Sequence, residues 1–268
     1  MADFKAVGAL RIEENTSLWI YDVDGDLTTY EVPLTAGLWY ILGDDSANDL
    51  LYHLETRIAA NVASLVDGGG LSMVRFDLSS SGIVSHYTND LDCEIQWTAA
   101  SGTNEATDVQ SWLRLEGYGS SSYAAPGLPG AGVASRVASY SFYPSYYLQV
   151  DLRPYETRAR QFVPDNGNAQ TIKIAQVDKY RLRFMTYGAP RTAGFTEYHM
   201  LEDFYEHAMS GRPFRLYADA TKTAAYSTSD RYGYQTMTMV PKDFDAAPLQ
   251  ANWYKNFTFD CDAYGYTE

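Results

Sequence analysis

The stretch that most constrains the fold is residues 195–219, FTEYHMLEDFYEHAMSGRPFRLYAD, where a helical pattern runs directly into a strand pattern. Apolar residues recur in its first part at spacings of three and four, which places them on one face of a helix. They are Met200, Leu201, Phe204, Tyr205 and Ala208. Thr196 can cap the start of this helix, and Gly211 followed by Pro213 is a typical helix end. The sequence therefore predicts an amphipathic helix near residues 196–210.

The strand pattern that follows has its apolar residues at every second position. Phe214, Leu216 and Ala218 alternate with Arg215, Tyr217 and Asp219, which predicts a strand with one buried face. Most of the remaining chain has strand and loop patterns. We therefore expect a sheet to pack against the helix near 196–210.

A second helix is predicted near residues 46–66. Ser46 is expected to open it, with Asp49 three positions later as an approximate capping box. Its apolar stripe consists of Leu50, Leu51, Leu54, Ile58, Val62 and Leu65. Residues 68–70, three glycines, are expected to end it, and residues 73–78 resume as a strand. This repeats the order strand, helix, glycine, strand, and predicts a β-rich α+β fold in which each half holds several strands and one amphipathic helix.

Further strands are predicted from alternating or continuous apolar patterns. Strands at 18–23 and 28–32 are expected to form a hairpin around the turn at Asp24 and Gly25, and 38–42 (LWYIL) is expected to be a buried strand. The others are 91–97, 146–153, 172–175, 178–187, 234–240 and 253–263. Residues 112–115 fit either a short strand or a helical turn.

The segment GYGSSSYAAPGLPGAGV at 117–133 cannot form regular structure, because it is rich in Gly, Ser and Pro. It suggests an N-terminal unit at 1–116, an arm or linker at 117–143 and a C-terminal unit at 144–268. Whether both units share one fold is left open.

The net charge of -14 narrows the range of partners. A nucleic-acid-binding protein needs an excess of Lys and Arg, so no sequence-specific nucleic-acid binding is expected. Binding to an anionic membrane surface is disfavoured for the same reason. An acidic protein does suit a conduit that lets DNA pass without holding it.

The chain holds 23 tyrosines, a residue that favours both strands and protein–protein interfaces. The five tyrosines that flank the Gly/Ser/Pro segment are the interface candidates: Tyr118, Tyr123, Tyr143, Tyr146 and Tyr147. The alternative is that they pack on their own domain.

The two cysteines, Cys93 and Cys261, match no metal-ligand spacing and lie on the apolar side of strand patterns. They are expected to be buried free thiols. The N-terminus lacks the apolar core of a signal peptide, and no run approaches the length of a membrane span. We therefore expect synthesis and folding in a reducing cytoplasm.

The motif DVDGD at 22–26 superficially resembles a calcium loop. Its glycine falls one position early, and Pro33 stands where a bidentate Glu is required. A solvated hairpin turn is the favoured interpretation, with a weak structural ion as the alternative.

The histidines and acids of the helix near 196–210 are predicted to be surface residues. His199 and His207 are eight positions apart and lack a third ligand, so no metal site is predicted. Glu202, Asp203 and Glu206 fit the solvated face of an amphipathic helix. No nucleophile elbow, P-loop or dinucleotide fingerprint is present, and we expect no catalytic residue and no cofactor.

Two pairs of segments resemble structural proteins of tailed-bacteriophage virions. HMLEDFYEHAMSGRPFRLYAD followed by PKDFDAAPLQANWYKNFTFDC is similar to tail and baseplate proteins of the distal-tail kind, in which an aromatic-bearing helix, a G-R-P-F-R strand and a W-x-x-x-F-x-F strand recur. YEVPLTAGLWYILGDDSANDLLYHLETRIAA followed by VRFDLSSSGIVSHY is similar to another virion pattern.

The resemblance implies β-sandwich or barrel units assembled into a ring around a DNA channel, as a trimer or hexamer together with other virion proteins. It transfers no catalytic residue. The expected function is thus a non-enzymatic virion component in the tail, tail tip or neck, made in the host cytoplasm. The alternatives are a capsid decoration or cement protein, a carbohydrate-binding module, and a hydrolase that uses the acidic pairs.

Overall fold

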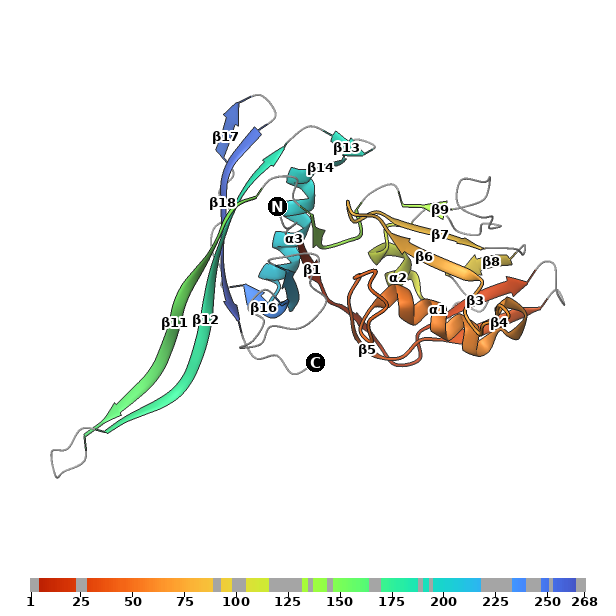
Figure 1. The fold of residues 1–268 in the computed structure, drawn as a ribbon, viewed down its shortest axis with the longest axis horizontal. Coiled ribbons are helices and arrows are strands. Elements are labelled where there is room, and N and C mark those ends of the chain that lie inside the picture. Colours follow the sequence, from red (N-terminus) through yellow and green to blue (C-terminus); the bar gives the residue numbers. More distant parts are fainter. Residues whose placement is uncertain are drawn as a thin grey trace.

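The computed structural model describes residues 5–22, 28–88, 93–97, 105–115, 132–134, 137–143, 147–163, 170–187, 190–192, 195–217, 233–239, 247–250 and 253–263. Within these residues the chain is strand-rich, with several antiparallel sheets and few helices, as the predicted β-rich α+β class requires (Figure 1).

The largest sheet has eight strands and joins the two ends of the chain. Its order is β10-β1-β15-β16-β18-β12-β11, and β17 pairs with β18 beside this path. The bounds are β1 Lys5–Gly8, β10 Ser141–Phe142, β11 Tyr147–Phe162, β12 Gln170–Tyr187, β15 Phe214–Tyr217, β16 Gln235–Met239, β17 Ala247–Gln250 and β18 Trp253–Ala263. Because β1 pairs with β15, residues 5–8 form part of the sheet built by the C-terminal half.

The smaller sheets belong mainly to the N-terminal half. They are β2-β5, β4-β3-β8, β6-β7-β9 and β13-β14. Their bounds are β2 Leu10–Ile12, β3 Ser17–Asp22, β4 Thr29–Pro33, β5 Gly37–Trp39, β6 Val74–Leu78, β7 Val84–Thr88, β8 Cys93–Gln96, β9 Gly132–Val133, β13 Pro190–Thr192 and β14 Phe195–Thr196. The pairing of β3 with β4 confirms the predicted hairpin, although its turn lies outside the described residues.

Two helices carry the main cores. Helix α1 (Leu50–Asn61) buries Leu50, Leu54 and Ile58 in the larger cluster, beside the 3-10 turn Ala63–Leu65 and the short helix α2 (Thr107–Trp112). Helix α3 (Glu197–Met209) buries the predicted residues Met200, Leu201, Phe204 and Ala208 against β1, β10, β15 and β16. A sheet therefore packs against this helix, as expected.

Helix α1 does not begin as predicted. Asp49 is the N-cap, and its carboxylate accepts a hydrogen bond from the backbone N–H of Leu51, whereas Ser46 lies outside the helix. The helix also ends at Asn61, well before the glycines at 68–70. The predicted range 46–66 was too wide because the flanking turns carry apolar residues too.

Three strand predictions need correction. The strands expected at 172–175 and 178–187 are one strand, β12, because its pairing with β11 continues across the interruption through register shifts. The strand expected at 38–42 is shorter, because β5 ends at Trp39 and Tyr40 forms an isolated bridge with Asp49. Its predicted burial is confirmed for residues 40–42, whereas Leu38 and Trp39 are half-buried. Strand β15 is buried at all four positions instead of on one face. Residues 112–115 take the helical alternative, since Trp112 ends α2.

Several strand predictions are confirmed. Strand β18 has the predicted bounds 253–263, and β16 lies within 234–240. Cys93 opens β8 and is a buried free thiol, with Ile95 on the same buried side.

Candidate assembly interface and buried polar sites

A long β-hairpin is the most prominent feature of the C-terminal half. Strand β11 has 16 residues and β12 has 18, and they pair from Tyr147 opposite Phe184 to Phe162 opposite Gln170. Strand β18 pairs with β12 only from Asp178 to Tyr187. Figure 1 shows the two strands continuing together away from α3 to an end remote from the other elements.

We call the part beyond β18 the distal hairpin: Glu156–Phe162 of β11 with residues 170–177 of β12. Its strands pair with each other and, within the described residues, with no third strand. A two-stranded hairpin is at best marginally stable in water, because it has too little apolar surface to bury. The distal hairpin is therefore an element suited to packing against another molecule.

The structure separates the five predicted interface tyrosines. Tyr147 is the first residue of β11, at the base of the hairpin. Tyr143 is 8% exposed and packs in the core cluster under α3. For this tyrosine the alternative prediction, packing within its own domain, is therefore the one that the structure shows. Its burial raises the pKa of its hydroxyl. Tyr118, Tyr123 and Tyr146 lie outside the described residues.

A buried cation between two tyrosine rings joins the large sheet to the N-terminal half. The Arg215 side chain is 2% exposed, and its guanidinium carbon lies 4.1 Å from the ring centroid of Tyr40 and 4.2 Å from that of Tyr234. Guanidinium groups stack well on aromatic faces, and such contacts strengthen when water is excluded. Arg215 is why β15 is buried on both faces, which simple alternation did not predict.

Lys5 forms a second contact of this kind. Its ammonium lies 4.4 Å from the ring centroid of Tyr217, and burial lowers the pKa of the amine although Asp44 and Asp49 oppose the shift. Asp49 itself is buried, and desolvation raises the pKa of its carboxyl. These charges lie at the junction between β1 and the loop before α1, where they fix one half of the chain on the other.

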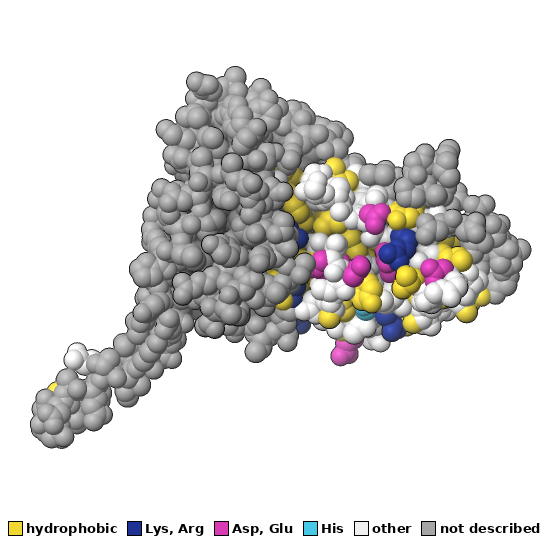
Figure 2. Space-filling view, viewed as in Figure 1, with side chains coloured by type: hydrophobic (Ala, Val, Ile, Leu, Met, Phe, Trp, Pro, Cys, Tyr) yellow, Lys and Arg dark blue, Asp and Glu magenta, His cyan; other side chains and the backbone are white. Residues whose placement is uncertain are grey.

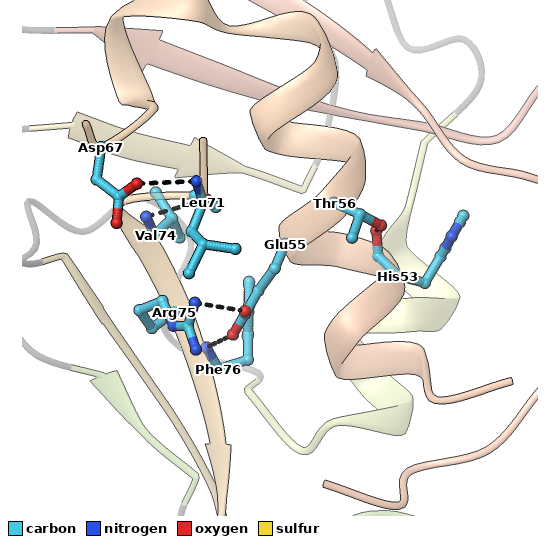
Figure 3. Close-up of polar contacts among 9 residues, drawn as sticks. His53, Glu55, Thr56, Asp67, Leu71, Val74, Arg75 and Phe76 are labelled. Atoms are coloured by element: carbon cyan, nitrogen blue, oxygen red, sulfur yellow. Dashed lines mark hydrogen bonds and ion pairs between the residues drawn. The ribbon is translucent and has the colours of Figure 1, made fainter. Parts of the chain in front are cut away.

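Glu55 is a buried carboxylate between α1 and β6 (Figure 3). It is 6% exposed, accepts a hydrogen bond of 2.7 Å from the backbone N–H of Phe76, and lies 3.2 Å from the guanidinium of Arg75. Burial raises the pKa of Glu55 to about 7, against the opposing effect of Phe76 and Arg75. Asp45 and Asp77 raise it further. Glu55 therefore titrates near neutral pH.

His207 is buried, so its prediction as a helix-surface residue is wrong. It is 2% exposed, and its ring lies 5.0 Å from that of Tyr140 and 5.6 Å from that of Trp112. Its Nε2 is 3.2 Å from the carbonyl of Pro213, so Nε2 carries the proton. Burial lowers the pKa of His207 to about 4. His199 is exposed, as predicted.

A pocket of about 490 Å³ lies beside this aromatic group, between α2, β2 and the loop before β15. Arg11, Arg114 and Arg212 line it together with Glu13 and Asp108. The guanidinium of Arg114 bonds Asp203 of α3 at 2.7 Å, so this acid of the predicted solvated face is in an ion pair. No histidine or cysteine is among the lining residues. The pocket is thus lined by charges of both signs.

The described part of the chain contains no group of three His, Cys, Asp or Glu residues placed to hold a metal ion. It also contains no helix long and apolar enough to cross a membrane. The calcium-like turn lies outside the described residues. The chain matches no protein-family model, and no curated protein sequence matches it.

Proposed function

We propose that this chain is a non-enzymatic structural component of a tailed-phage virion that assembles into an oligomeric ring in the tail, tail tip or neck. We also propose that the chain forms β-sandwich or barrel units, each flanked by a helix, and that it is located in the virion. Both rest on the two pairs of segments that resemble virion proteins.

The observation that carries the proposal is the distal hairpin. Among the residues that the structure describes, its strands pair with each other and with no third strand, and it projects from the body of the molecule (Figure 1). Ordering its residues costs about 1–2 kcal/mol each in backbone entropy, and a free two-stranded hairpin recovers little of that. Packing against a neighbouring subunit supplies the missing burial.

The rest of the molecule suits a rigid building block. Strand β1 pairs with β15, and Arg215 is stacked between tyrosines from both halves. Of the buried cations, Lys5 and Arg215 contact tyrosine rings of the opposite half of the chain. Among the described residues, the exposed large hydrophobic side chains are Tyr52, Leu71 and Val163.

Immunogold labelling of intact virions, and of separated heads and tails, tests the location. The proposal predicts label on tails or at the neck, because a ring protein copurifies with the part it builds. Label confined to heads would contradict it and support a capsid decoration protein. Absence of label from purified virions would exclude both.

A further inference from the structure

We propose that the distal hairpin binds the acidic body of a second copy of this chain through its charged faces. This inference rests on the proposed function, because it specifies how the proposed oligomer is held together.

The first observation is the uneven distribution of charge along the chain. Residues 147–187, the whole hairpin with its turn, contain seven of the 20 Lys and Arg residues and four of the 34 Asp and Glu residues. The hairpin therefore carries +3 in a chain of -14, which leaves -17 on the remainder. Opposite charge on two parts of one chain makes its copies electrostatically complementary.

The second observation is where the cations lie in the register. Near the base, the register places Lys179 opposite Asp262 and Arg181 opposite Asp260. In the described part of the distal hairpin the register sets apolar residues opposite the cations. Arg158 is opposite Ala175, Arg160 is opposite Ile172, and Lys173 is opposite Ala159.

The third observation is that β11 is a poor template for strand addition. It is the last strand of the sheet, and its edge is interrupted by Pro154, which has no N–H, within a register shift between Arg153 and Glu156. Prolines and cations on edge strands oppose pairing with another chain. Arg158 and Arg160 continue the cations along this edge strand into the distal hairpin, so we assign the contact to the charge of the hairpin rather than to strand addition on β11.

The receiving surface is the acidic part of the neighbouring copy. Among the described residues, exposed acids away from the pocket that Arg11 and Arg212 line include Asp45 and Asp77. Figure 2 shows acidic side chains at several places over the part of the molecule that holds α1 and α2. The hairpin extends beyond the sheet by seven β11 residues, roughly 20 Å at about 3.3 Å per residue. That length reaches well onto a neighbour.

The hairpin and the acidic body are different surfaces, so the contact is heterologous. Repeated head-to-tail contacts close into a ring when the rotation between copies allows it, and otherwise give a filament. A ring agrees with the proposed function. The contact must also weaken with salt, because the charges involved are screened over about 10 Å at moderate ionic strength.

Sedimentation velocity of the full chain tests this with matched charge reversals. The test variant is Arg158→Glu with Arg160→Glu, and the control is Arg11→Glu with Arg212→Glu, two exposed body arginines. Both variants make the net charge more negative by the same amount. Circular dichroism melting confirms that each variant is folded, and Arg158→Gln with Arg160→Gln gives a milder change at the same positions.

We expect the wild type to associate at about 50 mM salt and to lose about tenfold or more in affinity at about 500 mM. The hairpin reversal should weaken association about tenfold or more, the glutamine variant should fall between, and the control should stay within about threefold of wild type. Two results would overturn this inference but leave the proposed function standing. One is equal association of the hairpin variant and the wild type, and the other is an equal loss of affinity in the hairpin variant and the control variant. A wild type that stays monomeric at every concentration would overturn the proposed function as well.

Discussion

Among single residues, Glu55 links the pH to the stability of the N-terminal half. Its carboxyl has an ordinary pKa of 4.5 in the unfolded chain and about 7 when buried between α1 and β6. Between these values the folded protein binds more protons at Glu55 than the unfolded chain does. The resulting stabilisation is complete below pH 4.5 and is lost as the pH rises through about 7.

A Glu55→Gln variant isolates this effect, because Gln cannot titrate but can still accept the hydrogen bond from Phe76. From about pH 5 to pH 8, we expect the free energy of unfolding of wild type to fall relative to the variant by up to about 3 kcal/mol. Urea unfolding at a series of pH values measures it. The comparison cancels contributions from His53, His86 and His207, whose lowered pKa values give the opposite slope. A difference that does not vary with pH would contradict the account.

Gly8 makes room for the buried His207. A Cβ at Gly8 would lie 2.7 Å from Nε2 of His207 and 3.0 Å from the carbonyl oxygen of Tyr140. We expect Gly8→Ala to lower the free energy of unfolding by about 1–3 kcal/mol through overpacking. Gly68→Ala is the matched control, because nothing lies within 4 Å of its Cβ, and should change stability by about 0.5 kcal/mol or less. Similar urea midpoints for the Gly8 and Gly68 variants would contradict this prediction, because they would show that the His207 ring moves aside at little cost.

Among the elements, α1 depends on Asp49 for its start. The Oδ1 atom of Asp49 accepts from the backbone N–H groups of Leu42 and Leu51, and Oδ2 accepts from that of Asp44. Asp49→Ala should cost about 2–4 kcal/mol, since it removes a helix cap and leaves buried donors unpaired. Ser46→Ala should cost about 0.5 kcal/mol or less, because the Ser46 hydroxyl has no hydrogen-bond partner among the described residues. Thermal and urea unfolding compare the two, and a larger cost at Ser46 would restore the capping box predicted from sequence.

Sequence patterns predicted the elements that bury one continuous face. Strand β18 and the apolar stripe of α3 follow from spacing alone, and the α3 stripe packs on a core. The buried His207 and Arg215 were missed because their partners, Tyr140 and Tyr40, are distant in sequence. Local spacing contains no information about such tertiary contacts.

The long β11–β12 hairpin was also not predicted, because its pairing depends on more than the local sequence pattern. Its apolar alternation is interrupted after residue 175, which suggested two short strands in place of one. The continuous pairing with β11 depends on register shifts that no single-strand pattern reveals. Its length, which carries the proposed function, was therefore not predicted.

At the scale of the whole molecule, the chain combines a body fixed by internal contacts with one element that projects from it. Strand β1 and the Arg215 stack hold the two halves together, whereas the strands of the distal hairpin have no third partner strand in the described part of the chain. Removing the distal hairpin should therefore spare the fold and abolish assembly. We therefore expect the distal hairpin to make the contacts between copies of the chain.

The most direct test is sedimentation velocity on the full chain and on a variant in which residues 157–176 are replaced by an Asn-Gly turn. That dipeptide favours a tight hairpin between Glu156 and Val177, which are already opposite each other. We predict that the full chain sediments as an oligomer, and that the shortened chain sediments as a monomer at the same concentration with a melting temperature within about 2 °C. A full chain that is monomeric at every concentration, or a shortened chain that assembles equally well, would contradict the account.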